Sequence, residues 1–214
     1  LAAAGANDWE LPTFFELLSI IDFSQSGYSL DRDFFSASYS SGLWTSSETT
    51  GSDTEAFYLR LSDSLLLSTG KDSNFEVLCV KPDDFDYLQY VSEIQRFAGK
   101  EVSDKTMVKD NLTNLVFTMD YQVEVNHSNA SAYCEGLDYG GYTDWRLPEV
   151  KELFSLIDLE KAFPSTDFPD HPSLKFWTAT SCALYANCYW FVDFEDGQFS
   201  YAGNNNLSNA RCVR

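Results

Sequence analysis

The sequence predicts an α+β protein of two tandem domains, each with two helices packed on short antiparallel strands. Three observations support this prediction. Much of the chain aligns with itself, both copies carry an apolar helical stripe, and short alternating strand patterns follow that stripe. The length of 214 residues suits one or two domains, and 44% hydrophobic residues are enough to fill buried cores.

An internal repeat accounts for most of the chain. Residues 1–22 align with residues 137–158, and 11 of the 22 positions are identical, far above chance. From Trp44 to Lys81 the alignment resumes at an offset of 133 instead of 136. The three-residue difference falls in the intervening loop, where a change of length costs little.

The repeat predicts the domain boundaries. We expect a first repeat at residues 1–81, a linker at 82–93 and a second repeat at 94–214. The first copy has no counterpart of residues 96–136. We therefore expect the chain to be a fragment of a longer protein that begins inside its first repeat.

The second copy shows the order of its first elements. Thr106–Met119 is rich in β-branched residues around a polar turn, which predicts a strand pair. Apolar residues then recur at helical spacing, with Asn126 or Ser128 as the expected N-cap. We expect Gly140-Gly141 to end this helix.

A second helix and a group of strands follow. The apolar face of this helix consists of Val150, Leu153, Phe154 and Ile157. The matching face of the first copy consists of Phe14, Leu17, Leu18 and Ile21, after a capping box of Thr13 and Glu16. Strands are expected at Phe176–Thr178, in a hairpin around Asp196-Gly197, and at Ala210–Arg214.

The charge of the chain restricts its partners. The 33 acidic and 14 basic residues give a formal net charge of −19. Nucleic acid is not an expected partner, because phosphate binding needs clustered cations. Membrane insertion is not expected either, since no apolar run approaches the ~18 residues of a spanning helix. The acidity fits a solvated surface, or a surface that binds Ca²⁺.

The five cysteines suggest two disulfides and one odd thiol. Cys134 and Cys212 lie at the two ends of the second copy and are expected to be bonded. Cys182 and Cys188 are absent together from the first copy, so we expect them to bond with each other. Cys79 is left unpaired because its expected partner would precede residue 1. Its alternatives are an intermolecular disulfide or a free buried thiol.

Several blocks of sequence occur in the same order in both copies and carry a family resemblance. In the second copy they are Gly140–Pro148, Phe176–Thr178, Tyr189–Val192 and Arg211–Arg214. They resemble the C-terminal domain family of Legionella collagen-like proteins, in tandem. The resemblance implies a C-type-lectin-like fold, similar also to formylglycine-generating enzymes, with twisted antiparallel sheets and paired terminal strands. It also implies an extracellular, cell-surface or periplasmic location and an adhesin-like or ligand-binding role.

Two arginines of the second copy have no counterpart in the first. Arg146 is matched by Glu10, and Arg211 is matched by Leu78. We expect each arginine to make an internal ion pair or a backbone contact, and the alternative is ligand binding.

An enzyme is not expected. No nucleophile–histidine–acid set is visible, and the two histidines are not paired with any catalytic group by motif. Formylglycine-generating enzymes need two catalytic cysteines, whereas the repeat explains the cysteines of this chain structurally. The Cys182–Cys188 spacing also lacks the second close pair of a zinc site.

A ligand-binding site is predicted on the last hairpin. Its candidate residues are Asp193, Glu195, Asp196, Tyr201, Asn204, Asn205 and Asn206. Carboxylates, amides and an aromatic ring near one hairpin end suit a sugar, and clustered oxygens suit Ca²⁺. The alternative is a solvated hairpin with turn-forming asparagines. The tryptophans recur between the copies, so core packing is expected for most of them.

The sequence therefore predicts a non-enzymatic, secreted or cell-surface module that binds a ligand such as a glycan or a surface protein. The alternative is a structural or protein–protein interaction repeat of a larger bacterial surface protein. No cofactor is expected unless the site needs Ca²⁺.

Overall fold

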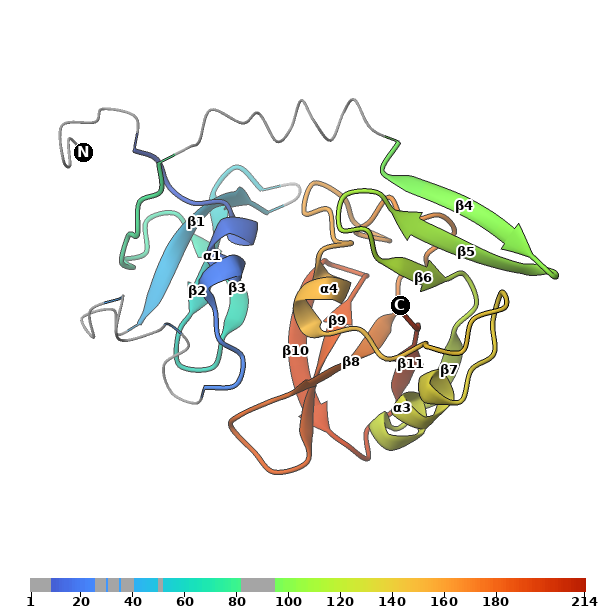
Figure 1. Ribbon diagram of the computed structural model, residues 1–214. Helices are drawn as coiled ribbons and strands as arrows, with labels where there is room; N and C mark the ends of the chain where they lie inside the picture. The colour runs from blue at the N-terminus through green and yellow to red at the C-terminus, as the bar shows by residue number, and fades with distance from the viewer. Residues whose placement is uncertain (1–8, 26–29, 31–34, 36–40, 50–51, 82–94) are drawn as a thin grey trace. The chain divides into compact units, whose positions relative to one another are not determined.

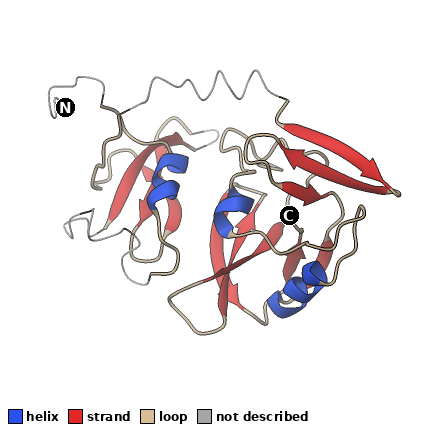
Figure 2. Ribbon diagram, in the orientation of Figure 1, coloured by secondary structure: helices blue, strands red, loops and turns tan. Residues whose placement is uncertain are grey.

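The computed structural model describes residues 9–25, 30, 35, 41–49, 52–81 and 95–214. The chain forms two compact units, one of residues 1–85 with 183–185 and one of residues 86–182 with 186–214 (Figure 1). The predicted linker at 82–93 and the first eight aligned residues lie outside the described residues. Each unit is mixed α and β, with more strand than helix (Figure 2).

The first unit has a helix and a three-stranded antiparallel sheet in its described part. Helix α1 spans Phe14–Ile20, and the predicted capping box of Thr13 and Glu16 is present. The strands, in the order β1-β2-β3, are β1 (Gly42–Glu48), β2 (Glu55–Arg60) and β3 (Leu65–Gly70). The apolar face of α1 is buried, and the helix contacts β1 and β2. Of the two helices expected in each repeat, this part of the unit contains α1 alone.

The second unit has two sheets and two helices. A three-stranded sheet consists of β4 (Phe97–Val102), β5 (Lys105–Asp110) and β6 (Val116–Thr118). A five-stranded sheet, in the order β10-β9-β8-β11-β7, consists of β7 (Gln122–Val125), β8 (Lys175–Ser181), β9 (Cys188–Asp193), β10 (Gln198–Gly203) and β11 (Ser208–Ala210). The helices are α3 (His127–Glu135) and α4 (Val150–Phe154).

The Cys134–Cys212 disulfide joins helix α3 to the end of the chain, as the repeat predicts. Both cysteines are fully buried, and they belong to a core cluster that also contains Trp145 and Trp177. The chain end pairs with β6, because Val116 and Arg214 exchange backbone hydrogen bonds of 3.0 and 2.9 Å. The disulfide and this pairing close the second unit on itself.

Three details of the second unit differ from the sequence prediction. The last strand, β11, spans Ser208–Ala210, whereas a strand was expected at Ala210–Arg214. Helix α3 ends at Glu135, because Gly136 caps it by donating its backbone N–H to the carbonyl of Ala132. Gly140 and Gly141 instead lie in a later turn, where both have positive φ. The five-stranded sheet is also not wholly antiparallel, because β11 pairs with β8 in parallel.

The sheets of the two units match residue by residue. At the offset of 133, the bounds of β1, β2 and β3 coincide with those of β8, β9 and β10. The pairing registers coincide as well, including an irregularity after Trp44 in β1 and after Trp177 in β8. The repeat seen in the sequence is therefore a repeat of backbone structure.

The described helices are short. The longest of them, α3, has nine residues, and no helix in the described part of the chain is long and apolar enough to span a bilayer.

Candidate functional site

The seven predicted ligand-binding residues lie at three places along one hairpin. Asp193 ends β9, and Glu195 and Asp196 form the turn that leads to Gln198 at the start of β10. Tyr201 lies within β10, and the three asparagines follow the far end of that strand. The expectation that all seven gather near one hairpin end is wrong, because β10 separates the acidic turn from the asparagines.

The acidic turn is held by its own hydrogen bonds and by one cation. Asp193 accepts from the backbone N–H of Glu195 at 3.1 Å and pairs with Lys175 at 3.4 Å. Asp196 accepts from the N–H of Gln198 at 3.2 Å. Partial burial, and then the charges of Asp193 and Glu195, raise the pKa of Asp196.

This turn does not form a recognisable Ca²⁺ site. Within the described residues, no group of three or more His, Cys, Asp or Glu side chains lies close enough to hold a metal ion. In the first unit the positions of Asp193 and Asp196 are occupied by Arg60 and Asp63, which form an ion pair. The second unit therefore has two carboxylates where the first has an arginine–carboxylate pair.

Tyr201 packs along the strand and is not part of either turn. It lies opposite Trp190 in the β9–β10 pairing, and the two rings meet edge to face at 5.3 Å between centroids. Trp190 is 2% exposed, whereas Tyr201 is partly exposed. Tyr201 thus serves as cover for the core, with one side accessible.

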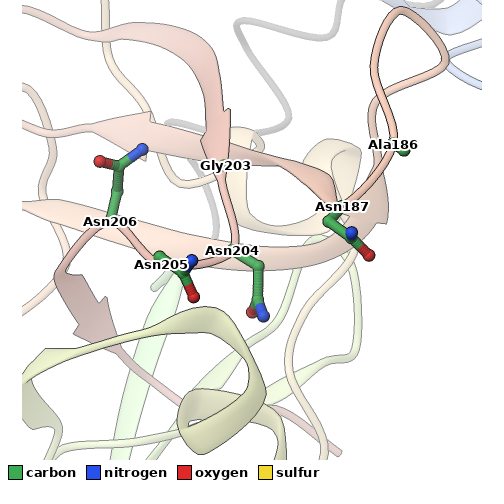
Figure 3. Close-up of a pocket in the computed structure, with 6 residues that line it drawn as sticks. All are labelled: Ala186, Asn187, Gly203, Asn204, Asn205 and Asn206. Atoms are coloured by element: carbon green, nitrogen blue, oxygen red, sulfur yellow. The ribbon is translucent and has the colours of Figure 1, made fainter.

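The three asparagines border a shallow depression of about 410 Å³ (Figure 3). Its lining residues are Ala186, Asn187, Gly203, Asn204, Asn205 and Asn206. They come from the loop before β9 and the turn after β10, two segments that meet at the end of the hairpin (Figure 3). The lining is dominated by amide side chains and backbone, which can both donate and accept hydrogen bonds.

Asn204 holds the base of this depression. Its Oδ1 accepts hydrogen bonds of 3.0 Å from both the backbone N–H and the hydroxyl of Ser128, in the first turn of α3. Its backbone N–H donates to the carbonyl of Asn187 at 2.7 Å, and its own carbonyl accepts from His127 at 3.1 Å. Asn204 is therefore committed to structure, whereas Asn205 and Asn206 are exposed.

The opposite wall is provided by a loop that sequence reasoning did not assign to the site. Asn187 has φ of 54°, in the left-handed region that asparagine tolerates better than most residues. It directly precedes Cys188, whose disulfide with Cys182 closes the loop. Asn187 lies inside the small covalent ring that Cys182 and Cys188 close, and this position in the sequence could have marked it as a candidate site residue.

The first unit contains the same turn with different side chains. Lys71 donates its backbone N–H to Thr54 at 2.9 Å, as Asn204 does to Asn187 at 2.7 Å. The Lys71 side chain forms an ion pair of 2.6 Å with Glu48. The lining asparagines of the second unit are thus replaced by Thr54, Lys71, Asp72 and Ser73. The amide lining is a property of the second unit.

Both histidines are buried and bound to backbone carbonyls. His127 Nε2 lies 2.9 Å from the carbonyl of Thr178, and burial lowers its pKa. His171 Nδ1 lies 2.9 Å from the carbonyl of Pro172. Burial, and then the charge of Arg211, lower the pKa of His171 to about 3. Both imidazoles are therefore neutral parts of the core at physiological pH.

Arg146 and Arg211 make the internal contacts expected of them. Arg146 binds both carboxylate oxygens of Glu152 at 2.7 Å. Arg211 is fully buried, and its Nη1 donates to the carbonyls of Thr118 and Met119. Neither residue lines the amide-lined depression.

Comparison with known proteins agrees with the resemblance seen in the motifs. No curated protein sequence matches the chain. The family described as the Lcl C-terminal domain, which comprises secreted or surface domains, matches residues 1–81 and 106–214. These two matches include both repeats and most of the chain, so the chain belongs to the Lcl C-terminal domain family.

Proposed function

We propose that this protein is a non-enzymatic ligand-binding or adhesion module of a secreted or cell-surface bacterial protein, built as two tandem C-type-lectin-like domains. Family membership supports the location, and two disulfides are typical of proteins that fold in an oxidising compartment. The polar groups of the depression suit a ligand that is bound by hydrogen bonds and is not transformed.

The observation that carries the proposal is the amide-lined depression on the second unit. Its base is fixed by the hydrogen bonds of Asn204 to Ser128 of helix α3, and its wall is fixed by the Cys182–Cys188 ring. Asn205 and Asn206 are exposed beside it, and their side-chain amides have no hydrogen-bond partner among the described residues. Because the backbone beneath these amides is already fixed, only the side chains have to be ordered when a ligand binds, which lowers the entropy cost of binding.

The chemistry favours an uncharged glycan. Amides both donate and accept hydrogen bonds, as sugar hydroxyls require. A sulfated or otherwise polyanionic glycan would be repelled by a chain with 19 excess negative charges. Because no carboxylate lines the depression, we expect this binding to be independent of Ca²⁺.

A glycan array probed with the full chain tests the proposal. Neutral glycans should bind equally in Ca²⁺ and in a chelator. Replacing Asn205 and Asn206 with alanine removes at least two hydrogen bonds of about 0.5–1.5 kcal/mol each, so affinity should fall by about tenfold. The matched control replaces Asp72 and Ser73, the equivalent residues of the first unit, and should leave binding unchanged.

Binding of no glycan in either condition would refute the glycan assignment, as would an equal loss of affinity in the control. The second candidate function is a protein-interaction repeat. It is favoured by a separate observation, the exposed apolar residues Leu11 and Val77 of the first unit.

A further inference from the structure

Five apolar residues of the second unit form a fully covered face. They are Trp145, Leu147, Trp177, Ala210 and Cys212, and each is at most 2% exposed. All five belong to one core cluster with Ala130 and Cys134, which helix α3 contributes. This face is therefore buried by α3 and the strand that precedes it.

The same five positions of the first unit are all at least partly exposed. We call them the open face, and they are Trp9, Leu11, Trp44, Val77 and Cys79. Leu11 is 38% exposed and Val77 is 44% exposed, while the other three are partly exposed. Core packing was expected for most of the tryptophans, and the three of the second unit are at most 2% exposed, whereas Trp9 and Trp44 are partly exposed.

The backbone beneath the two faces is the same. Glu10 and Val80 exchange hydrogen bonds of 3.0 and 2.9 Å, as Arg146 and Val213 do at the equivalent positions. Strands β1 and β8, which carry Trp44 and Trp177, have the same bounds and register. The two units therefore differ in what covers the face and not in how the face is built.

The second unit shows what covers such a face. The indole N–H of Trp177 donates to the carbonyl of Val125 in β7 at 2.9 Å. The ring also meets His127 of α3 edge to face at 5.6 Å between centroids. Cys134 of α3 then bonds to Cys212, with 5.5 Å between the Cα atoms. The cover thus supplies a carbonyl, an apolar helix face and a cysteine.

The first unit has counterparts of the covered groups, but none of its described residues supplies a counterpart of this cover. The indole N–H of Trp44 has no acceptor among the described residues, and Cys79 is a free thiol. Phe75 replaces Ser208 of the second unit and meets the Trp44 ring edge to face at 5.2 Å. Phe75 covers Trp44 only in part, so it replaces only part of the layer that covers Trp177 in the second unit.

We propose that the open face is a docking surface for a cysteine-bearing strand-and-helix segment of the β7–α3 type. The segment would present a backbone carbonyl to Trp44, a small apolar helix face to Leu11 and Val77, and a cysteine to Cys79. This inference goes beyond the proposed glycan site and does not depend on it, because the two lie on different repeats. The covering layer of the second unit is its direct structural precedent.

The test uses a peptide of residues 96–136 as the probe, with its cysteine activated as a mixed disulfide with 2-thiopyridine. Cys79 is the free cysteine of the full chain, since the other four are bonded. Its thiolate attacks the cysteine sulfur of the peptide, a new disulfide forms, and pyridine-2-thiolate leaves with the electron pair of the broken bond. The rate of this disulfide exchange is measured from the release of pyridine-2-thiolate.

The control peptide carries Ala130→Asp, which places a charge on the helix face but leaves the activated cysteine unchanged. Docking should make the reaction of the native peptide at least about tenfold faster than that of the control. The emission of Trp44, assigned with a Trp44→Phe variant, should shift to shorter wavelength as the ring is covered. In a Cys79→Ser chain the covalent product should be absent and the emission shift should persist.

Equal rates for the two peptides, or an unchanged Trp44 emission, would overturn the proposal. Concentration-dependent dimerisation that itself shifts the Trp44 emission would also overturn it, because the occupant would then be a second copy of the first unit.

Discussion

Replacing both Cys134 and Cys212 with alanine is expected to lower the free energy of unfolding of the second unit by about 4.5 kcal/mol at 25 °C. The cysteines are 78 residues apart, and closing a loop of that length removes about 15 cal/mol/K of chain entropy from the unfolded state. The same relation for Cys182 and Cys188, which are 6 residues apart, gives about 2.2 kcal/mol. Removing two buried sulfur atoms from the core also lowers the free energy of unfolding, so it adds to the effect of removing the cross-link.

Hydrogen exchange followed through a urea series measures both effects. Exchange resolves the two units separately, which is needed because a chain of two units does not have to unfold in one step. Strands β1–β3 serve as the internal control, since neither disulfide lies in the first unit. If replacing Cys182 and Cys188 destabilises the second unit as much as replacing Cys134 and Cys212, the loop-length reasoning is wrong.

Two further changes probe the buried histidine and the base of the depression. Because the folded-state pKa of His171 is about 3, below its unfolded value of about 6.5, the unfolded state binds a proton first as the pH falls. Its contribution to stability should therefore be complete above pH ~6.5 and decline by a few kcal/mol toward pH ~3, and urea midpoints should depend less on pH in His171→Phe. Asn204→Ala removes the side-chain acceptor for Ser128 and should cost about 1 kcal/mol, with faster exchange in the first turn of α3. Asn205→Ala is its control, and an equal change there would show that the hydrogen bonds between Asn204 and Ser128 are not responsible.

Much of the fold was predictable because it depends on local patterns. The capping box and apolar face of α1, the strands of the last hairpin and both disulfides follow from spacing and from the repeat. The end of α3 was not predictable in the same way. Gly136 and Gly140 are both plausible caps by residue type, and only the tertiary fold places Gly140 against Met107 in a separate turn.

The candidate site was predictable in part. Its three asparagines were identified from composition, but their separation from Asp193 and Asp196 depends on the length of β10. Asn187 was missed because it enters the site through the fold and not through proximity in sequence. The open face was missed for the same reason, since burial of Trp177 and exposure of Trp44 depend on a layer that lies far away along the chain.

The ion pair between Lys175 and Asp193 has a consequence for how such a chain folds. Strands of two repeats with the same length and register can be exchanged during folding, which is a characteristic error of repeat proteins. Lys175 lies opposite Asp193 in the β8–β9 pairing, and Gly42 lies opposite Arg60 in the β1–β2 pairing. Pairing β8 with β2 would place Lys175 against Arg60, and like charges directly opposite each other destabilise a sheet. The exchanged pairing of β8 with β2 is therefore less stable than the correct pairing of β8 with β9.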